Sequence, residues 1–270
     1  MGAPAHPSPL RPVVEAVESA AVLDGPGAKI GQAIRGAIAP GPVKDALSGT
    51  WLGHAVHPLL TDVVIGSFVS ATLLDLLGGP KSERAAERLI AVGIAAYGPT
   101  AATGGNDWAD TEMASPEVRR VGLVHAASNA TALILYGASL SARRRGARSR
   151  GKTLAAAGAA VLGLGGYLGG HLAFTRGVGP NQTAFDPGPS EWTPAISTSE
   201  LVAGEPKRIV VGDTPVFLLR RNGALYALHD RCSHRGCSLA QGRIEGESVV
   251  CRCHGSRFSL RDGSVERGPA

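Results

Sequence analysis

One short stretch near the C-terminus, residues 232 to 258, constrains this chain more than any other. It holds all four of the chain's cysteines and two of its eight histidines. Cys232 and His234 stand two positions apart, Cys251 and His254 stand three apart, and sixteen residues separate the two pairs. Two loops can therefore each offer one thiolate and one imidazole to the same metal centre. The pattern predicts an iron–sulfur site.

The mixture of two thiolates and two imidazoles has a definite chemical use. In a [2Fe-2S] cluster, two thiolates can hold one iron while two neutral imidazoles hold the other, which raises the potential to about −150 to +300 mV. Imidazoles exposed at a loop tip can also lose a proton on oxidation, so that electron transfer is coupled to proton transfer. This property suits quinols and similar electron donors.

Two other uses of these residues must be weighed. A Cys2His2 quartet can bind tetrahedral zinc, and four cysteines can form two structural disulfides. Neither use explains Gly236, Gly255 and Ser256, which are placed to admit backbone and hydroxyl hydrogen-bond donors. We therefore favour the iron–sulfur interpretation.

The stretch resembles the Rieske proteins of the respiratory and photosynthetic quinol-oxidising complexes, whose two loops read C-x-H-x-G-C and C-x-C-H-G-S. The matching residues are Cys232, His234, Gly236, Cys237, Cys251, Cys253, His254, Gly255 and Ser256. The resemblance implies that Cys232 and Cys251 bind one iron of a single [2Fe-2S] cluster. It implies that His234 and His254 bind the other iron.

The resemblance also assigns the remaining residues of the two loops. It implies that Cys237 is bonded to Cys253, a pairing that the sequence alone does not prove. It implies that Ser256 donates a hydrogen bond to a cluster sulfur. Phe258 departs from the high-potential members, which have a tyrosine whose hydroxyl reaches a cysteine sulfur. Because one hydrogen bond is missing, we expect a lower, intermediate potential.

The composition divides the chain into two parts and predicts a multidomain protein. Residues 59–174 are rich in Ala, Gly, Leu and Val, whereas residues 190–270 have the pattern of short strands and turns. We expect an all-α four-helix transmembrane domain followed by a small all-β Rieske domain with antiparallel sheets and a two-loop cluster-binding subdomain. The expected boundaries are 1–45 for a disordered or amphipathic segment, 46–178 for the membrane domain, 179–190 for a linker, and 191–270 for a Rieske domain that lacks its final strands.

Four apolar runs support the membrane domain. They cover residues 59–78, 89–103, 121–142 and 154–174, and the second is short and contains Pro99. A spanning helix needs about 20 apolar residues. A soluble four-helix bundle is the alternative, but it would show a charged face at helical spacing. The third and fourth runs show almost none, so a bacterial cell membrane protein with several spans is predicted.

Basic residues predict the orientation of these spans. The net charge is +5 and the pI is about 9.3, but the arginines gather between two apolar runs without a nucleic-acid-binding motif, so we expect no nucleic-acid partner. Four spans place both termini on one side. Nine basic residues lie near the span ends on the opposite side and four on the terminal side. The positive-inside rule then places the cluster domain outside the cytoplasm, where a disulfide persists.

The membrane half also resembles a family of small four-span bacterial domains of unknown function. The matching residues are Leu47, Ser48, Gly49, Trp51, Leu52, Gly53, His54, His57, Pro58 and Leu59, followed by similar motifs in the later runs. Because this family has no assigned activity, the resemblance supports the architecture and supplies no mechanism.

Four polar residues of the membrane half should meet near one face of the membrane, the face of the cluster domain. They stand at the ends of the four runs and are His57, Asp107, His125 and His171. Ionisable groups at membrane depth are costly and are often functional. These residues can bind haem b between two histidines, line a quinol pocket, or simply form hydrogen bonds between helices.

Together these features predict a membrane-anchored carrier of single electrons whose partner is a redox protein or a quinol. One alternative is an oxidoreductase whose membrane domain binds quinol, haem or another substrate. A second is the ferredoxin of an oxygenase, which would have a cytoplasmic cluster, and a third is a redox sensor without turnover. The chain has no nucleotide-binding loop, no flavin or NAD fingerprint and no nucleophile elbow.

Overall fold

The computed structural model of this chain describes residues 9–270, and it forms two compact units. One unit contains the described residues up to Ala37 together with Val56–Val178. The other unit contains Ile38–Ala55 and Gly179–Ala270. The prediction of an unstructured start falls partly on residues 1–8, which lie outside the described residues.

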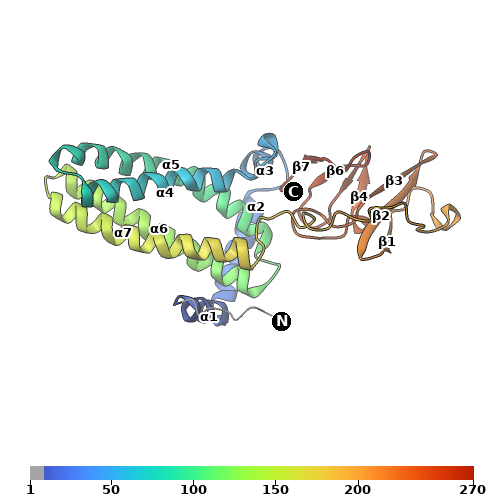
Figure 1. Cartoon of the computed structure of the whole chain (residues 1–270), viewed down its shortest axis with the longest axis horizontal. Coiled ribbons are helices and arrows are strands. Elements are labelled where there is room, and N and C mark those ends of the chain that lie inside the picture. The colour runs from blue at the N-terminus through green and yellow to red at the C-terminus, as the bar shows by residue number, and fades with distance from the viewer. Residues whose placement is uncertain (1–8) are drawn as a thin grey trace. The chain divides into compact units, whose positions relative to one another are not determined.

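The first unit is helical (Figure 1). Its helices are α1 (Arg11–Ser19), α2 (Asp24–Ala37), α4 (Val56–Leu77), α5 (Glu83–Thr111), α6 (Pro116–Arg144) and α7 (Arg148–Gly170), with short helical turns at Ala21–Leu23, Pro80–Ser82 and His171–Thr175. The start of α6 has clear local causes, because Pro116 stands in its first turn and the Ser115 side chain accepts a hydrogen bond from the Val118 amide.

The four long helices form a bundle. Helix α4 packs against α5 and α7, and α6 packs against the same two helices, so α4 and α6 face each other across the core. At the centre, the rings of Phe68 and Tyr136 stack with their centroids 4.0 Å apart. Nearer one end, Asp75 pairs with Arg143, and both side chains are only 4% exposed. The two diagonal helices are therefore joined by side chains that meet in the core.

Three of these helices are long and apolar enough to cross a membrane: Val56–Leu77, Pro116–Arg144 and Arg148–Thr175, the last including the turn after α7. Large apolar side chains of α4, such as Leu59, Leu73 and Leu76, are exposed, as expected for a surface that meets lipid. Helix α5 has the same 29-residue length as α6, but it is not among the helices that are apolar enough to cross a membrane. The fourth span therefore stays a prediction.

The second unit contains two antiparallel sheets, as the sequence predicts for the cluster domain. One sheet has the order β1 (Lys207–Val211), β2 (Thr214–Arg221), β3 (Ala224–His229); the other has the order β4 (Arg243–Glu245), β5 (Ser248–Val250), β6 (Arg257–Ser259), β7 (Val265–Arg267). Asn222 and Gly223 both have positive φ between β2 and β3, the conformation that a two-residue hairpin turn requires. The predicted lack of final strands stays a prediction; Val265–Arg267 forms the strand that pairs with β6.

Residues 38–55, including α3 (Pro42–Ser48), pack with the strands of the second unit. The Asp45 carboxylate accepts hydrogen bonds from Arg267 Nε at 2.6 Å and from the Gly268 amide at 3.1 Å. The Thr50 hydroxyl donates to the Gly268 carbonyl at 2.7 Å. These contacts connect the segment before α4 to the last residues of the chain. The domain boundaries predicted at residues 46, 179 and 191 stay predictions.

Candidate metal centre

Two loops of the second unit have the same backbone closure. In the loop after β3, the Gly236 amide donates to the Cys232 carbonyl at 2.7 Å, and the Cys232 amide donates to Cys237 at 2.8 Å. In the loop between β5 and β6, the Gly255 amide donates to Cys251 at 3.0 Å, and Cys251 donates to Ser256 at 2.8 Å. Each loop therefore folds back on its own cysteine.

A glycine is required at the turning point of each loop. Gly236 has φ of 72° and Gly255 has φ of 76°, a left-handed conformation that residues with a side chain rarely adopt. The amide of each glycine makes the bond that closes its loop. The two glycines of the sequence motif thus have a backbone function at this site.

The two cysteines that open these loops are unbonded and buried, with 2% and 1% of their surface exposed. Their thiols share a hydrogen bond, which raises the pKa of Cys232. The same hydrogen bond, with help from the backbone amides of Cys253 and His254, lowers the pKa of Cys251 to about 6. Two sulfur atoms, one of them readily ionised, therefore lie side by side beneath the loops, as ligands of one iron would.

Two imidazoles lie together in the same loops. The ring centroids of His234 and His254 are 4.9 Å apart, and the rings meet edge to face. Burial lowers the pKa of His234 to about 3, and repulsion from nearby bases, including Arg235 and Lys44, acts in the same direction. His234 is therefore neutral near pH 7, which is the state that binds a metal.

Two buried polar atoms here lack a hydrogen-bond partner among residues 9–270. They are Nδ1 of His234 and the hydroxyl oxygen of Ser256, a residue with no exposed surface. Leaving such atoms without a partner costs about 1–3 kcal/mol each. A bound iron–sulfur cluster fits both, because iron accepts an imidazole nitrogen and a cluster sulfur accepts a hydroxyl hydrogen.

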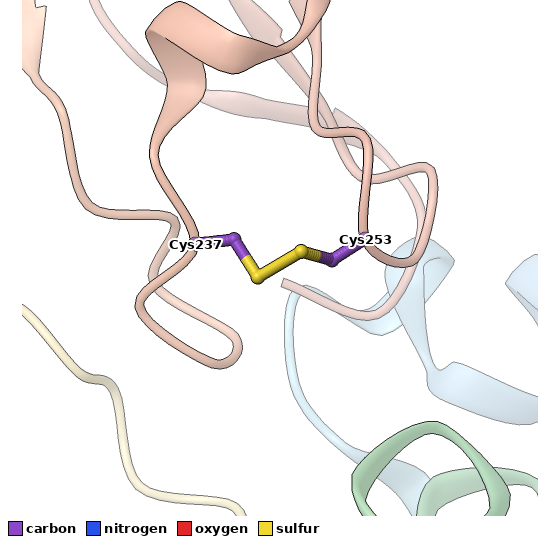
Figure 2. The surroundings of a disulfide bond; sticks show 2 residues. All are labelled: Cys237 and Cys253. Atoms are coloured by element: carbon purple, nitrogen blue, oxygen red, sulfur yellow. A yellow bond between two sulfur atoms is a disulfide. The ribbon is translucent and has the colours of Figure 1, made fainter. Parts of the chain in front are cut away.

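A disulfide joins the two loops. Cys237 and Cys253 are bonded, with Cα atoms 6.6 Å apart, and they stand 16 positions apart in the sequence. Figure 2 shows the bond running from one loop to the other. The sulfur of Cys251 lies within 4.8 Å of both. Because Cys237 and Cys253 are bonded to each other, neither is a thiolate, and the unbonded sulfurs left in the loops are those of Cys232 and Cys251.

Two sheets that present a pair of cysteine–histidine loops, joined by a disulfide, define the class of small iron–sulfur electron-transfer proteins with mixed ligands. Residues 191–270 match the family described as Rieske [2Fe-2S] domain, and residues 53–182 match a family described as predicted membrane protein (DUF2231). This chain belongs to the Rieske family through its C-terminal domain, and its cofactor is a [2Fe-2S] cluster.

Relatives with assigned names match the Rieske part. The anthranilate 1,2-dioxygenase ferredoxin subunit of Burkholderia cepacia is 32% identical over 80 residues, which cover 30% of this chain and 74% of the relative. The biphenyl 2,3-dioxygenase ferredoxin component of Rhodococcus jostii is 32% identical over 29% of this chain and 73% of its own. Sulredoxin of Sulfurisphaera tokodaii is 35% identical over 29% and 72%. Each of these matches covers less than a third of this chain.

The four polar residues predicted to meet in the membrane half have separate partners. His57 Nδ1 lies 3.0 Å from the Thr100 carbonyl, and His125 Nδ1 lies 2.8 Å from the Gly165 carbonyl. The structure thus gives His57 and His125 equivalent backbone partners.

The other two are held elsewhere. His171 Nε2 lies 2.7 Å from the carboxylate of Glu18, which also accepts a hydrogen bond from Arg176. Asp107 accepts a hydrogen bond from the Asn106 side chain at 3.2 Å. Sequence reasoning missed the backbone carbonyls that orient the two histidines. A usable signal was present, because glycine recurs on α5 and α7 at equal spacings.

Proposed function

We propose that this protein is a membrane-anchored carrier of single electrons in which Cys232 and Cys251 bind one iron of the cluster and His234 and His254 bind the other. The observation that supports this assignment most strongly is the pairing of two buried, unbonded sulfurs with two adjacent imidazoles in loops of identical closure. When bound, the cluster accepts and releases one electron.

The surrounding residues hold and tune the site in this proposal. The Ser256 hydroxyl donates to a cluster sulfur, which favours the more negative reduced state and raises the potential. The Cys237–Cys253 disulfide keeps the two loops together. Leu239 and Phe258, 2% and 4% exposed, keep water away from the cysteine side.

Variants of the four ligands test this assignment. Cys232→Ser, His234→Ala, Cys251→Ser and His254→Ala should each abolish the electron paramagnetic resonance (EPR) signal of the reduced cluster, because a missing ligand opens an iron to water. Wild-type protein should contain about two irons and two acid-labile sulfides per chain. Arg231→Ala, at an exposed position beside the first loop, is the control and should retain both. A cluster signal that survives in any of the four ligand variants would refute the ligand set.

A second candidate function is the supply of electrons to an oxygenase. It is favoured by the names of two relatives, which are ferredoxin components of dioxygenases. The midpoint potential of the cluster distinguishes a carrier that takes electrons from a quinol from one that serves an oxygenase. A quinol donor requires a high cluster potential that depends on pH, whereas an oxygenase requires a low one. A redox titration at two pH values therefore separates them.

We also propose that all four long helices span the membrane and that the cluster domain lies on the outer side. Helix α5 connects two apolar helices and packs beside both, and its length of 29 residues is ample for about 30 Å of hydrocarbon. The excess of basic residues near the α4–α5 and α6–α7 turns supports this orientation.

A further inference from the structure

The helical unit contains two hairpins with the same internal pattern, α4–α5 and α6–α7. Three pairs of residues occupy equivalent positions, at equal spacings along α4 and α6: His57 and His125, Phe68 and Tyr136, and Asp75 and Arg143. Glycines repeat in the same way along α5 and α7: Gly93 and Gly158, then Gly104 and Gly169. The pattern is that of an internal duplication with a pseudo-twofold axis along the bundle.

Equivalent residues meet each other across this axis. Phe68 stacks on Tyr136 in the middle of the bundle, and Asp75 pairs with Arg143 toward the end formed by the α4–α5 and α6–α7 turns. The glycines make room for the rings, since a Cβ at Gly93 would lie 2.5 Å from the Phe68 ring and one at Gly158 would lie 3.0 Å from the Tyr136 ring. Two of the three layers are thus complementary pairs.

The histidine layer differs from the other two because it pairs two bases. His57 and His125 stand at equivalent positions eleven residues before Phe68 and Tyr136, but the described residues provide neither a stacking contact nor an ion pair between them. Two imidazoles at equivalent positions are two potential ligands for one metal centre, a property that neither of the other layers has. This layer is therefore the candidate ligand site of the bundle.

The two imidazoles are oriented alike. Nδ1 of each faces a backbone carbonyl at an equivalent position, Thr100 for His57 at 3.0 Å and Gly165 for His125 at 2.8 Å. A carbonyl only accepts, so Nδ1 carries the hydrogen and Nε2 carries the lone pair. Metal-binding histidines in proteins are commonly held in this way. Nε2 of His57 is thus the nitrogen left to act as a ligand. Nε2 of His125 accepts a hydrogen bond from the Asn129 side chain at 3.2 Å, which a metal bound at this nitrogen would displace.

Glycines on the facing helices let the two imidazole rings lie directly against the backbone. A Cβ at Gly104 would lie 2.5 Å from Cε1 of His57, and a Cβ at Gly169 would lie 3.0 Å from Cε1 of His125. The neighbouring Gly105 and Gly166 add no side chain either. Helices α5 and α7 therefore present bare backbone on both flanks of the histidine layer.

The number of ligands limits what can bind here. A bare zinc ion takes about four protein ligands, but among residues 9–270 the only cluster of three or more Cys, His or acidic ligand atoms is in the cysteine loops. Iron in a porphyrin obtains four ligands from the macrocycle and needs only two axial ones. Facing helices of a four-helix bundle commonly supply such cofactor ligands from the core.

We propose that His57 and His125 are the two axial ligands of a haem bound within the four-helix unit. The haem would be held between the two imidazoles, beside Gly104 of α5 and Gly169 of α7, and it would displace the Asn129 amide from His125. Such a haem would give the chain a second one-electron centre, independent of the cysteine loops.

Absorption spectroscopy of the full-length protein, purified in detergent from cells supplied with a haem precursor, tests this proposal. We expect about one haem per chain by the pyridine haemochrome assay, with the spectrum of a six-coordinate low-spin iron. His57→Ala and His125→Ala should each lose this spectrum, whereas His54→Ala, at an exposed position nearby, should keep it. His125→Met should retain haem with an altered spectrum, because methionine also serves as an axial ligand.

The cluster signal comes from the other unit and shows that each variant is produced with a folded Rieske domain, while the haem retained by His125→Met shows that the helical unit itself is folded. Loss of haem with an intact cluster signal in the two alanine variants supports the proposal. Three results would overturn it: no haem bound in wild-type protein even after titration with haemin, haem retained in both alanine variants, or histidine-dependent binding of a short-chain ubiquinol analogue without haem. The last result would assign the same imidazoles to a quinol.

Discussion

Each cluster loop closes on its own cysteine through the same backbone hydrogen bonds, so the differences that tune this site lie in single side chains. The loop glycines are fixed by positive φ, and the four proposed ligands are fixed by chemistry. Ser256 and Phe258 are the buried positions where the protein can vary the hydrogen bonding around the cluster. The potential is therefore set at the scale of the residue.

Phe258→Tyr should raise the midpoint potential. The ring of Phe258 is 4% exposed and packs in the core of the cluster domain, so a hydroxyl added to it can donate to a cysteine sulfur. One such hydrogen bond contributes about 1 kcal/mol, or about 40 mV for a one-electron couple. Redox titration of the variant measures the shift. Phe258→Leu is the control without a hydroxyl, and an equal or lower potential in the tyrosine variant would contradict the prediction.

At the scale of elements, the disulfide joins loops that no strand pairing connects directly. Replacing both Cys237 and Cys253 by serine should destabilise the cluster domain by about 3 kcal/mol, as expected for a closed loop of this size. We expect the double variant to lose its cluster at lower temperature in a thermal scan of cluster absorbance. Wild-type protein whose disulfide has been reduced should also lose its cluster at lower temperature. An unchanged transition in both would show that the bond does not hold the loops.

The contact between α3 and the end of the chain is a second connection at this scale. Asp45 and Arg267 are 23% and 43% exposed, so solvent screening limits their coupling to about 1 kcal/mol or less. A double-mutant cycle with Asp45→Ala and Arg267→Ala should give a coupling of this size in chemical unfolding. The Arg11–Glu15 ion pair, which is exposed on α1, provides a control double-mutant cycle, for which we expect a coupling near zero. No coupling between Asp45 and Arg267 would mean that α3 does not dock on the last strand.

The sequence was sufficient for some of these elements and insufficient for others. The spacing of Cys232, His234, Cys251 and His254 predicts both loops, because metal ligands at short spacing are a local signal. The bond between Asp45 and Arg267 joins residues 222 positions apart, and nothing local to either residue indicates it. Likewise, helix periodicity placed His171 at the end of its run but could not show that it turns to Glu18 of α1.

At the scale of the whole molecule, the orientation in the membrane follows from the number of spans and the distribution of basic residues. If all four long helices span, a single cysteine introduced at Ser149 should be unreachable by a membrane-impermeant label in intact cells, whereas one at Ser190 should react. Both positions are exposed on the protein surface. The parent chain, whose cysteines are buried or disulfide-bonded, is the control. Reversed labelling would place the cluster in the cytoplasm, and labelling of both would mean that α7 does not span.

The central claim is that this membrane-anchored chain carries one electron on a cluster with two histidine ligands. The most direct measurement is a potentiometric titration of the full-length protein in its membranes, followed by EPR spectroscopy. We predict a single one-electron transition with a mixed-ligand cluster signal and a midpoint between about −150 and +300 mV. A signal that titrates near −400 mV, as in plant-type ferredoxins with four cysteine ligands, or the absence of any cluster signal in folded protein, would contradict the account.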